Sequence, residues 1–141
     1  MSLSIILPSF NDFDDVRAGL AYLQDNIQDL EFDIIIVDDG SRFTNDYMLL
    51  AKSFNNVQLS THNINLGKGA AVQSGVFHST AEYIIVVDSD VPFYYQYICD
   101  IFEILSKENV DIVCGDRGSD SQNSEKIPLG RRLLSNLFNI I

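Results

Sequence analysis

Short apolar runs that alternate with segments of helical periodicity are the feature that most constrains how this chain can fold. The apolar runs lie at residues 3–7, 32–37, 57–61, 83–87 and 110–114. Helical segments are expected at residues 14–28, 45–54 and 67–79, and after Pro92 through Lys107. Runs that are apolar on both faces are typical of buried parallel strands, with helices covering the sheet. The sequence therefore predicts an α/β fold with a mostly parallel sheet flanked by helices.

The expected helices carry their apolar residues on one side. In the first helix the apolar stripe consists of Val16, Leu20, Leu23 and Ile27. In the helix that ends at Lys107 it consists of Ile98, Ile101, Phe102 and Leu105. This spacing is typical of a helix that packs one face against a core.

Length and charge restrict the classes of function. The chain has 141 residues, enough for one domain, and a formal net charge of −11. The charge argues against a nucleic-acid partner, because phosphate backbones require clustered Lys and Arg. No apolar run reaches the roughly 18 residues of a spanning helix, and the N-terminus lacks the basic region of a signal peptide, which predicts a cytoplasmic location. Cys99 and Cys114 lie in apolar stretches without metal-ligand spacing, so buried, reduced thiols are expected.

Polar residues follow each predicted strand. In an open parallel sheet, ligands bind beyond the carboxyl ends of the strands. Here those ends are followed by residues 8–12, 38–41, 63–69, 88–90 and 115–117. We therefore expect polar groups from separate segments to meet at one edge of the sheet.

Asp88 and Asp90 form the most specific pair at this edge. Side chains at i and i+2 of an extended segment point the same way, about 6.5 to 7 Å apart at the Cα level, so Ser89 would face away. Two carboxylates on one side can share a hard cation such as Mg²⁺ or Mn²⁺. The alternative is a solvated turn after a strand, where Asp is common.

Asp38 and Asp39 follow the second apolar run. A carboxylate here could accept hydrogen bonds from a base or a ribose. The alternative is an Asp-Gly turn, with the next helix capped by Ser41 or Thr44.

Positive charge near this edge is sparse. Gly67 and the residues after it would let the backbone approach an anionic ligand at a helix N-terminus, with Lys68 adding charge; the alternative is glycine packing of the helix on the sheet. The guanidinium of Arg117 could donate hydrogen bonds to diphosphate oxygens; the alternative is an ordinary exposed arginine in a loop. His62 and His78 are isolated in the sequence, and no role is predicted for them.

Taken in order, these segments resemble family 2 glycosyltransferases of the GT-A fold, and most of all the polyprenyl-phosphate sugar transferases. The resemblance is carried by IILPSFND at 5–12, IIIVDDGS at 34–41, NLGKGAAVQSG at 65–75, VVDSDVP at 86–92, GDR at 115–117 and PLGRRLLSNLFN at 128–139. The family usually has D-A-D where this chain has D-S-D, a change that keeps both carboxylates. It usually has G-S-R where this chain has G-D-R.

The resemblance implies roles at the matching positions. The nucleotide site would be lined by Pro8, Phe10 and Asn11, with Asp38 or Asp39 recognising base or ribose. Asp88 would lie by the ribose and diphosphate, and Asp90 would be the direct metal ligand. The donor phosphates would be near Lys68 and Arg117, and an acceptor phosphate near Arg131, with Arg132 as a second candidate.

The resemblance further implies an inverting transfer of a hexose from a UDP- or GDP-sugar to a polyprenyl phosphate or a glycan acceptor, with Mg²⁺ or Mn²⁺ as cofactor. Residues 1–117 would form the nucleotide-sugar-binding core, and 118–141 a mobile loop and the start of the acceptor-side helix. Family members continue further, so the rest of the domain is expected to be absent from this chain. Peripheral association with the cytoplasmic face of a membrane through that absent part, and a homodimer, are further hypotheses.

Two alternatives stay open at this point. A receiver-type phospho-acceptor signalling domain is also parallel, acidic and of this size, although its acidic pair follows the first strand, where this chain has Pro8-Ser9-Phe10. A fragment that binds the donor sugar without turning it over is the other. An NAD-binding domain is disfavoured because no G-x-G-x-x-G follows the first strand.

Overall fold

The computed structural model describes residues 2–27, 30–89, 97–108 and 110–114. Along the chain the elements are β1 (Leu3–Ser9), α1 (Phe13–Asn26), β2 (Phe32–Asp38), α2 (Thr44–Lys52), β3 (Val57–Thr61), α3 (Lys68–His78), β4 (Tyr83–Val86) and α4 (Ile98–Lys107). Residues 1–111 and 112–141 form two units, and all of these elements belong to the first.

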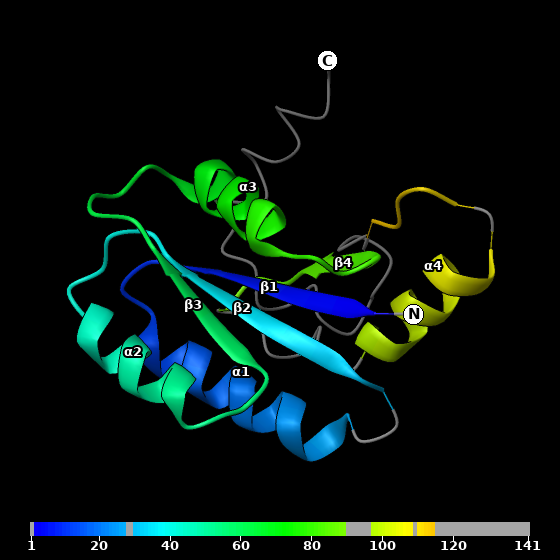
Figure 1. Ribbon diagram of the computed structural model, residues 1–141, viewed down its shortest axis with the longest axis horizontal. Helices are drawn as coiled ribbons and strands as arrows, with labels where there is room; N and C mark the ends of the chain where they lie inside the picture. The colour runs from blue at the N-terminus through cyan, green and yellow to red at the C-terminus, as the bar shows by residue number, and fades with distance from the viewer. Residues whose placement is uncertain (1, 28–29, 90–96, 109, 115–141) are drawn as a thin grey trace, which may run out of the picture. The chain divides into compact units, whose positions relative to one another are not determined.

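The strands form one four-stranded parallel sheet in the order β3-β2-β1-β4 (Figure 1). Register aligns the carboxyl ends of the three strands on one side: Ser9 of β1 pairs with Asp38 of β2, and Asp38 pairs with Thr61 of β3. The predicted α/β class and the mostly parallel sheet are confirmed. The loops that follow these strands therefore begin at one level.

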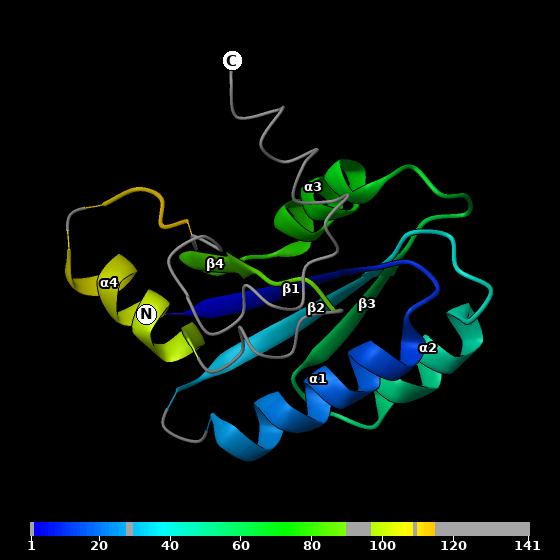
Figure 2. The same cartoon turned by 180° about the vertical axis from the view of Figure 1, so that it is seen from behind.

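Helices cover both faces of the sheet. Helices α1 and α2 lie on one face and α3 on the other, as the two opposite views agree (Figures 1 and 2). Along β1, Ile5 and Leu7 belong to the larger core, which includes the α1 stripe, while Ile6 packs with Ala71 of α3. This alternation explains why the strand runs are continuously apolar, since each side chain is buried whichever face it meets.

Helix α3 approaches the sheet closely at Gly75. A Cβ at this position would lie 2.5 Å from Cγ2 of Ile6 and 3.2 Å from Cγ2 of Val37. The absence of a side chain at Gly75 thus sets the height of α3 above the sheet, and with it the height of the helix N-terminus at Lys68.

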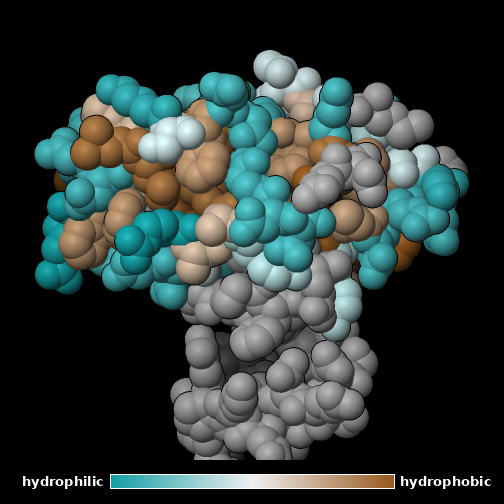
Figure 3. All heavy atoms as spheres, turned by 90° about the horizontal axis from the view of Figure 1, so that it is seen from below, coloured by the Kyte–Doolittle hydropathy of each residue, from teal (hydrophilic) through white to brown (hydrophobic). Residues whose placement is uncertain are grey.

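The surface carries hydrophilic residues with hydrophobic ones between them, as the view from below shows (Figure 3). Cys99 and Cys114 are exposed, which corrects the prediction that they are buried. Cys99 directly follows Ile98, the first residue of the apolar stripe of α4, and so lies off the packed face of that helix. No helix in the described part of the chain is long and apolar enough to cross a bilayer.

The predicted strand over residues 110–114 is wrong. The described residues of this segment form no strand, and Val110 and Ile112 are 40% and 79% exposed. A strand gains its hydrogen bonds only from a neighbour, and β4 pairs with β1 alone among the described strands. The composition of this segment indicated a high β propensity, but it could not show whether a neighbouring strand was available for pairing.

Candidate functional site

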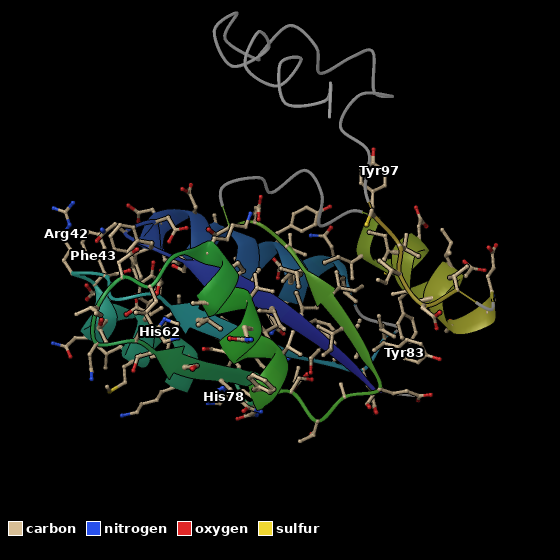
Figure 4. All side chains as sticks on the ribbon, turned by 90° about the horizontal axis from the view of Figure 1, so that it is seen from above. Arg42, Phe43, His62, His78, Tyr83 and Tyr97 are labelled. Carbon is tan, nitrogen blue, oxygen red and sulfur yellow. The ribbon has the colours of Figure 1, made fainter. Side chains whose placement is uncertain are left out.

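The loops after β1 and β2 are joined where the two strands end. The backbone N–H of Asp39 donates to the carbonyl of Ser9 (2.9 Å), which continues the strand pairing by one residue. The N–H of Asn11 donates to the Ser41 hydroxyl (2.8 Å). Arg42, Phe43 and His62 all lie toward this end of the sheet, whereas Tyr83, at the start of β4, lies toward the other (Figure 4).

The β1 loop presents Phe10 and Asn11 in different ways. Phe10 is 48% exposed, while Pro8 is buried within β1. Asn11 has a positive φ of 59°, a conformation in which Asn is enriched, and its Oδ1 accepts hydrogen bonds from the N–H of Arg42 (3.1 Å) and from its Nε (3.4 Å). Of the three residues predicted to line a nucleotide site, Phe10 offers the most surface to a ligand.

Asp38 is fully buried and closes the turn after β2. Its Oδ1 accepts the N–H of Ser41 (2.9 Å) and its Oδ2 accepts the Thr44 hydroxyl (2.5 Å). Helix α2 begins after Phe43 with no side-chain cap, so neither Ser41 nor Thr44 plays the capping role considered for them. Asp38 therefore accepts a backbone N–H three residues further along the chain and stabilises the loop that leads into α2.

Asp39 holds the segment that leads into α3. Its carboxylate accepts the N–H groups of Leu66 (2.9 Å) and Gly67 (2.8 Å) and lies 2.6 Å from Nδ1 of His62. Burial by itself raises the pKa of Asp39, but the hydrogen bonds from these three residues hold that pKa below its ordinary value. The ionised carboxylate is therefore the anchor of residues 62–67.

His62 is a residue of the site that sequence reasoning missed. Its Nε2 lies 2.8 Å from the Ser74 hydroxyl of α3, so the imidazole links Asp39 to that helix. Because a carboxylate only accepts, Nδ1 carries a proton. A usable signal existed: His62 directly follows β3, at the same strand-end position that drew attention to Asp38 and Asp88.

Gly40 lets the β2 and β3 loops touch. Its φ is +77°, and a Cβ on it would lie 2.5 Å from the carbonyl carbon of Ile64 and 2.7 Å from the nitrogen of Asn65. Any other residue would be strained and would push these loops apart.

Lys68, the first residue of α3, forms an ion pair with Asp88, which follows β4. The lysine side chain is 60% exposed and that of Asp88 22%. The two residues predicted to act near donor phosphates are therefore in contact, at a helix N-terminus whose N–H groups favour anions.

Asp12 receives three hydroxyl groups. Its Oδ1 accepts hydrogen bonds from Ser9 and Tyr47 (2.9 Å from the phenol), and its Oδ2 accepts one from Ser89. Burial of Tyr47, and secondarily the nearby Asp12 carboxylate, raise the pKa of that phenol above its ordinary value, so it stays a donor at neutral pH. Asp12 occurs in the quoted sequence pattern, but no role was predicted for it.

These contacts close a circuit around the carboxyl edge. The β1 loop bonds to the β2 loop through Asn11, and the β2 loop to the start of α3 through Asp39. Lys68 then reaches Asp88, and Ser89 returns to Asp12 of the β1 loop. The convergence of polar segments expected from the strand ends is thus present for four loops.

Of the two predicted metal ligands, only Asp88 lies among the described residues. Asp90, Arg117, Arg131 and Arg132 lie outside the described residues. Within the described part of the chain, no three His, Cys, Asp or Glu residues are grouped as metal ligands. The Asp88 carboxylate fits a hard divalent cation by donor type, and Ser89 is turned inward (4% exposed), as the alternation of side chains along an extended segment predicts.

The fold defined by this sheet and its edge is the GT-A glycosyltransferase fold. A Pyrobaculum calidifontis mannosyltransferase solved with GDP-Man and Mn²⁺ superimposes with a TM-score of 0.56 at 21% identity, over 62% of this chain and 27% of the other. S. aureus TarS (residues 1–349) solved with UDP-GlcNAc gives a TM-score of 0.52 at 26% identity, over 64% of this chain and 27% of the other.

The sequence profile of glycosyl transferase family 2 matches residues 4–140, and the chain belongs to this family. Dolichyl-phosphate beta-glucosyltransferases of Trichomonas vaginalis and Dictyostelium discoideum are each 30% identical to it, over 94% and 98% of this chain. The same alignments cover 45% and 47% of those relatives, so the chain spans just under half of their length. The family match favours the glycosyltransferase hypothesis over the receiver-type alternative.

Proposed function

We propose that this chain is the donor-binding part of an inverting glycosyltransferase that moves a hexose from a nucleotide-diphosphate sugar to a polyprenyl phosphate, or to a glycan acceptor. The observation that carries the proposal is the Lys68–Asp88 pair at the N-terminus of α3, held within the circuit of strand-end loops. The names of the curated relatives support a lipid-phosphate acceptor and a glucosyl donor.

The chain's own groups can bind a diphosphate in a strongly acidic protein. The net charge of −11 repels anions, so local positive charge must compensate. Lys68 supplies an exposed ammonium, and the first N–H groups of α3 point to the same place. Phe10 offers an exposed aromatic side chain next to the β1 end, where a base could pack.

A divalent cation, Mg²⁺ or Mn²⁺, is part of the proposal. Asp88 and Asp90 would hold it, and when bound it would supply Lewis-acid neutralisation of the departing nucleoside diphosphate. The Asp88 carboxylate is already turned to the same edge as Lys68. Arg117 remains a further predicted contact of the donor phosphates.

The acceptor decides whether a base is needed. A lipid phosphate is already ionised, so it can attack without a general base, whereas a sugar hydroxyl requires a carboxylate base. Arg131 is the predicted contact of an acceptor phosphate. Peripheral membrane association and a homodimer stay hypotheses about the whole protein.

Differential scanning fluorimetry of the 141-residue chain tests the proposal. UDP-glucose and GDP-mannose are each added with and without Mn²⁺, and a ligand that binds only the folded chain raises its Tm. We expect one of the two sugars to raise the Tm in the presence of Mn²⁺ and much less in EDTA. No shift with either sugar would contradict donor binding. A shift without hexosyl transfer to added polyprenyl phosphate would favour the alternative of donor binding without turnover.

A further inference from the structure

Ser89 differs from Asp88, its neighbour in the D-S-D segment, in where its side chain lies. The serine is 4% exposed, whereas the Asp88 side chain is 22% exposed and pairs with Lys68. The hydroxyl of Ser89 points into the protein and donates to Oδ2 of Asp12. Ser89 thus attaches this segment to the loop after β1.

Asp12 is well suited to hold such an attachment, because it is fixed from several sides. Its carbonyl accepts the N–H groups of Asp15 (3.0 Å) and Val16 (3.1 Å) in the first turn of α1. Its Oδ1 accepts the hydroxyls of Ser9 and Tyr47. Asp12 is therefore held to α1 by its backbone carbonyl and to β1 and α2 by its carboxylate, independently of Ser89.

Tyr47 gives this arrangement its rigidity. The ring is fully buried and packs edge-on against Phe13, with ring centroids 5.3 Å apart. A phenol held in this way cannot follow a moving carboxylate without breaking core packing. Asp12 therefore has a fixed position relative to the sheet.

We propose that the Asp12–Ser89 hydrogen bond positions the acidic segment, so that Asp12 and Ser89 are positioning residues for divalent-cation binding. The proposal rests on the proposed function, because it assumes that Asp88 and Asp90 hold a cation with the nucleotide. A serine between the two aspartates makes a hydrogen bond to Asp12 that an alanine at this position cannot make. This hydrogen bond fixes the backbone at Ser89, directly after Asp88, and thereby the direction of the Asp88 carboxylate.

The magnitude follows from the known effect of groups that orient metal ligands. Their loss typically weakens metal affinity about 10- to 100-fold. Ser89→Ala removes one oxygen and leaves Asp12 with its two other hydroxyl partners. We expect this variant to raise the Kd for Mn²⁺ about tenfold at saturating UDP or GDP.

The test uses the 141-residue chain with Mn²⁺ as the probe, its binding followed by electron paramagnetic resonance. Nucleotide affinity in EDTA is measured by calorimetry for each variant, and thermal unfolding reports stability. Ser89→Thr keeps a hydroxyl and should bind Mn²⁺ within about threefold of the wild type. Ser60→Ala, a buried serine of β3 away from this segment, is the matched control and should leave the Kd unchanged.

A positioning role predicts a particular split. Ser89→Ala should weaken Mn²⁺ binding while nucleotide affinity in EDTA stays at the wild-type value, which a general loss of stability would not do. Asp12→Asn tests the same bond from its other end, and the double variant should be no weaker than the weaker single variant. A wild-type Kd for Mn²⁺ in Ser89→Ala overturns the inference alone. If the wild type binds no Mn²⁺ with either nucleotide, the proposed function falls and the inference with it.

Discussion

The imidazole of His62 lies against the carboxylate of Asp39, with Nδ1 2.6 Å from Oδ1. The two residues come from the ends of neighbouring strands, β3 and β2. Asp39 also accepts the N–H groups of Leu66 and Gly67, which immediately precede Lys68. The place of the lysine at the carboxyl edge therefore depends on a buried carboxylate that a ligand need not touch.

Asp39→Asn should destabilise the fold and flatten its dependence on acid pH. The asparagine side chain has a single acceptor oxygen, so it cannot replace both carboxylate oxygens. The hydrogen bonds lost to a buried charged group cost about 3 kcal/mol in total. Because hydrogen bonds hold the pKa of Asp39 below its ordinary value, its contribution is present above about pH 4 and is lost as pH falls through the lower folded pKa. Urea unfolding at pH 7 and at pH values below 4 measures both effects.

The control for this prediction is Asp111→Asn, at an exposed position. It should leave the free energy of unfolding within about 0.5 kcal/mol of the wild type. An Asp39→Asn variant that loses as much stability at low pH as the wild type would show that Asp39 does not titrate as described.

Gly75→Ala should destabilise the chain by about 1–3 kcal/mol, because a methyl group would meet Ile6 at 2.5 Å in a packed core. Gly69→Ala is the matched comparison in the same helix, since a Cβ there meets nothing within 4 Å. Alanine at that position should be neutral or stabilising by up to about 1 kcal/mol. Equal effects of the two substitutions on thermal unfolding would argue against close packing at Gly75.

Lys68→Ala should weaken nucleotide-diphosphate binding about tenfold, the loss of one hydrogen bond to a charged group. Stability should change little, because the lysine side chain of the ion pair with Asp88 is 60% exposed to solvent. Lys52 is the last residue of α2, and the control variant Lys52→Ala should bind nucleotide diphosphates like the wild type. Calorimetry with UDP and GDP compares the three proteins; equal affinities would remove Lys68 from the site.

Much of the fold follows from local sequence. The predicted strand over 57–61 matches β3, and the apolar stripe from Val16 to Ile27 is buried as expected. Apolar periodicity reports burial directly, so these elements could be predicted. The prediction that Cys99 is buried was wrong because it followed the apolar composition of the segment and not the stripe of α4, which leaves Cys99 off the packed face.

The edge of the sheet was predictable as a place, but its internal contacts were not. Strand ends identify Asp39 and Asp88, yet the partners of Asp39 lie 23 to 28 residues away and share no pattern with it. The link between Asp12 and Ser89 spans 77 residues. Such pairs arise from strand order, which sequence periodicity does not encode.

The central claim is that the carboxyl edge binds a nucleoside diphosphate together with a divalent cation. Isothermal titration calorimetry of UDP and GDP into the wild type and into Asp90→Ala, each with Mn²⁺ and with EDTA, tests it most directly. We expect Mn²⁺ to tighten binding of one nucleotide to the wild type, and this gain to vanish in Asp90→Ala. Equal affinity of the two proteins in Mn²⁺ would contradict the account.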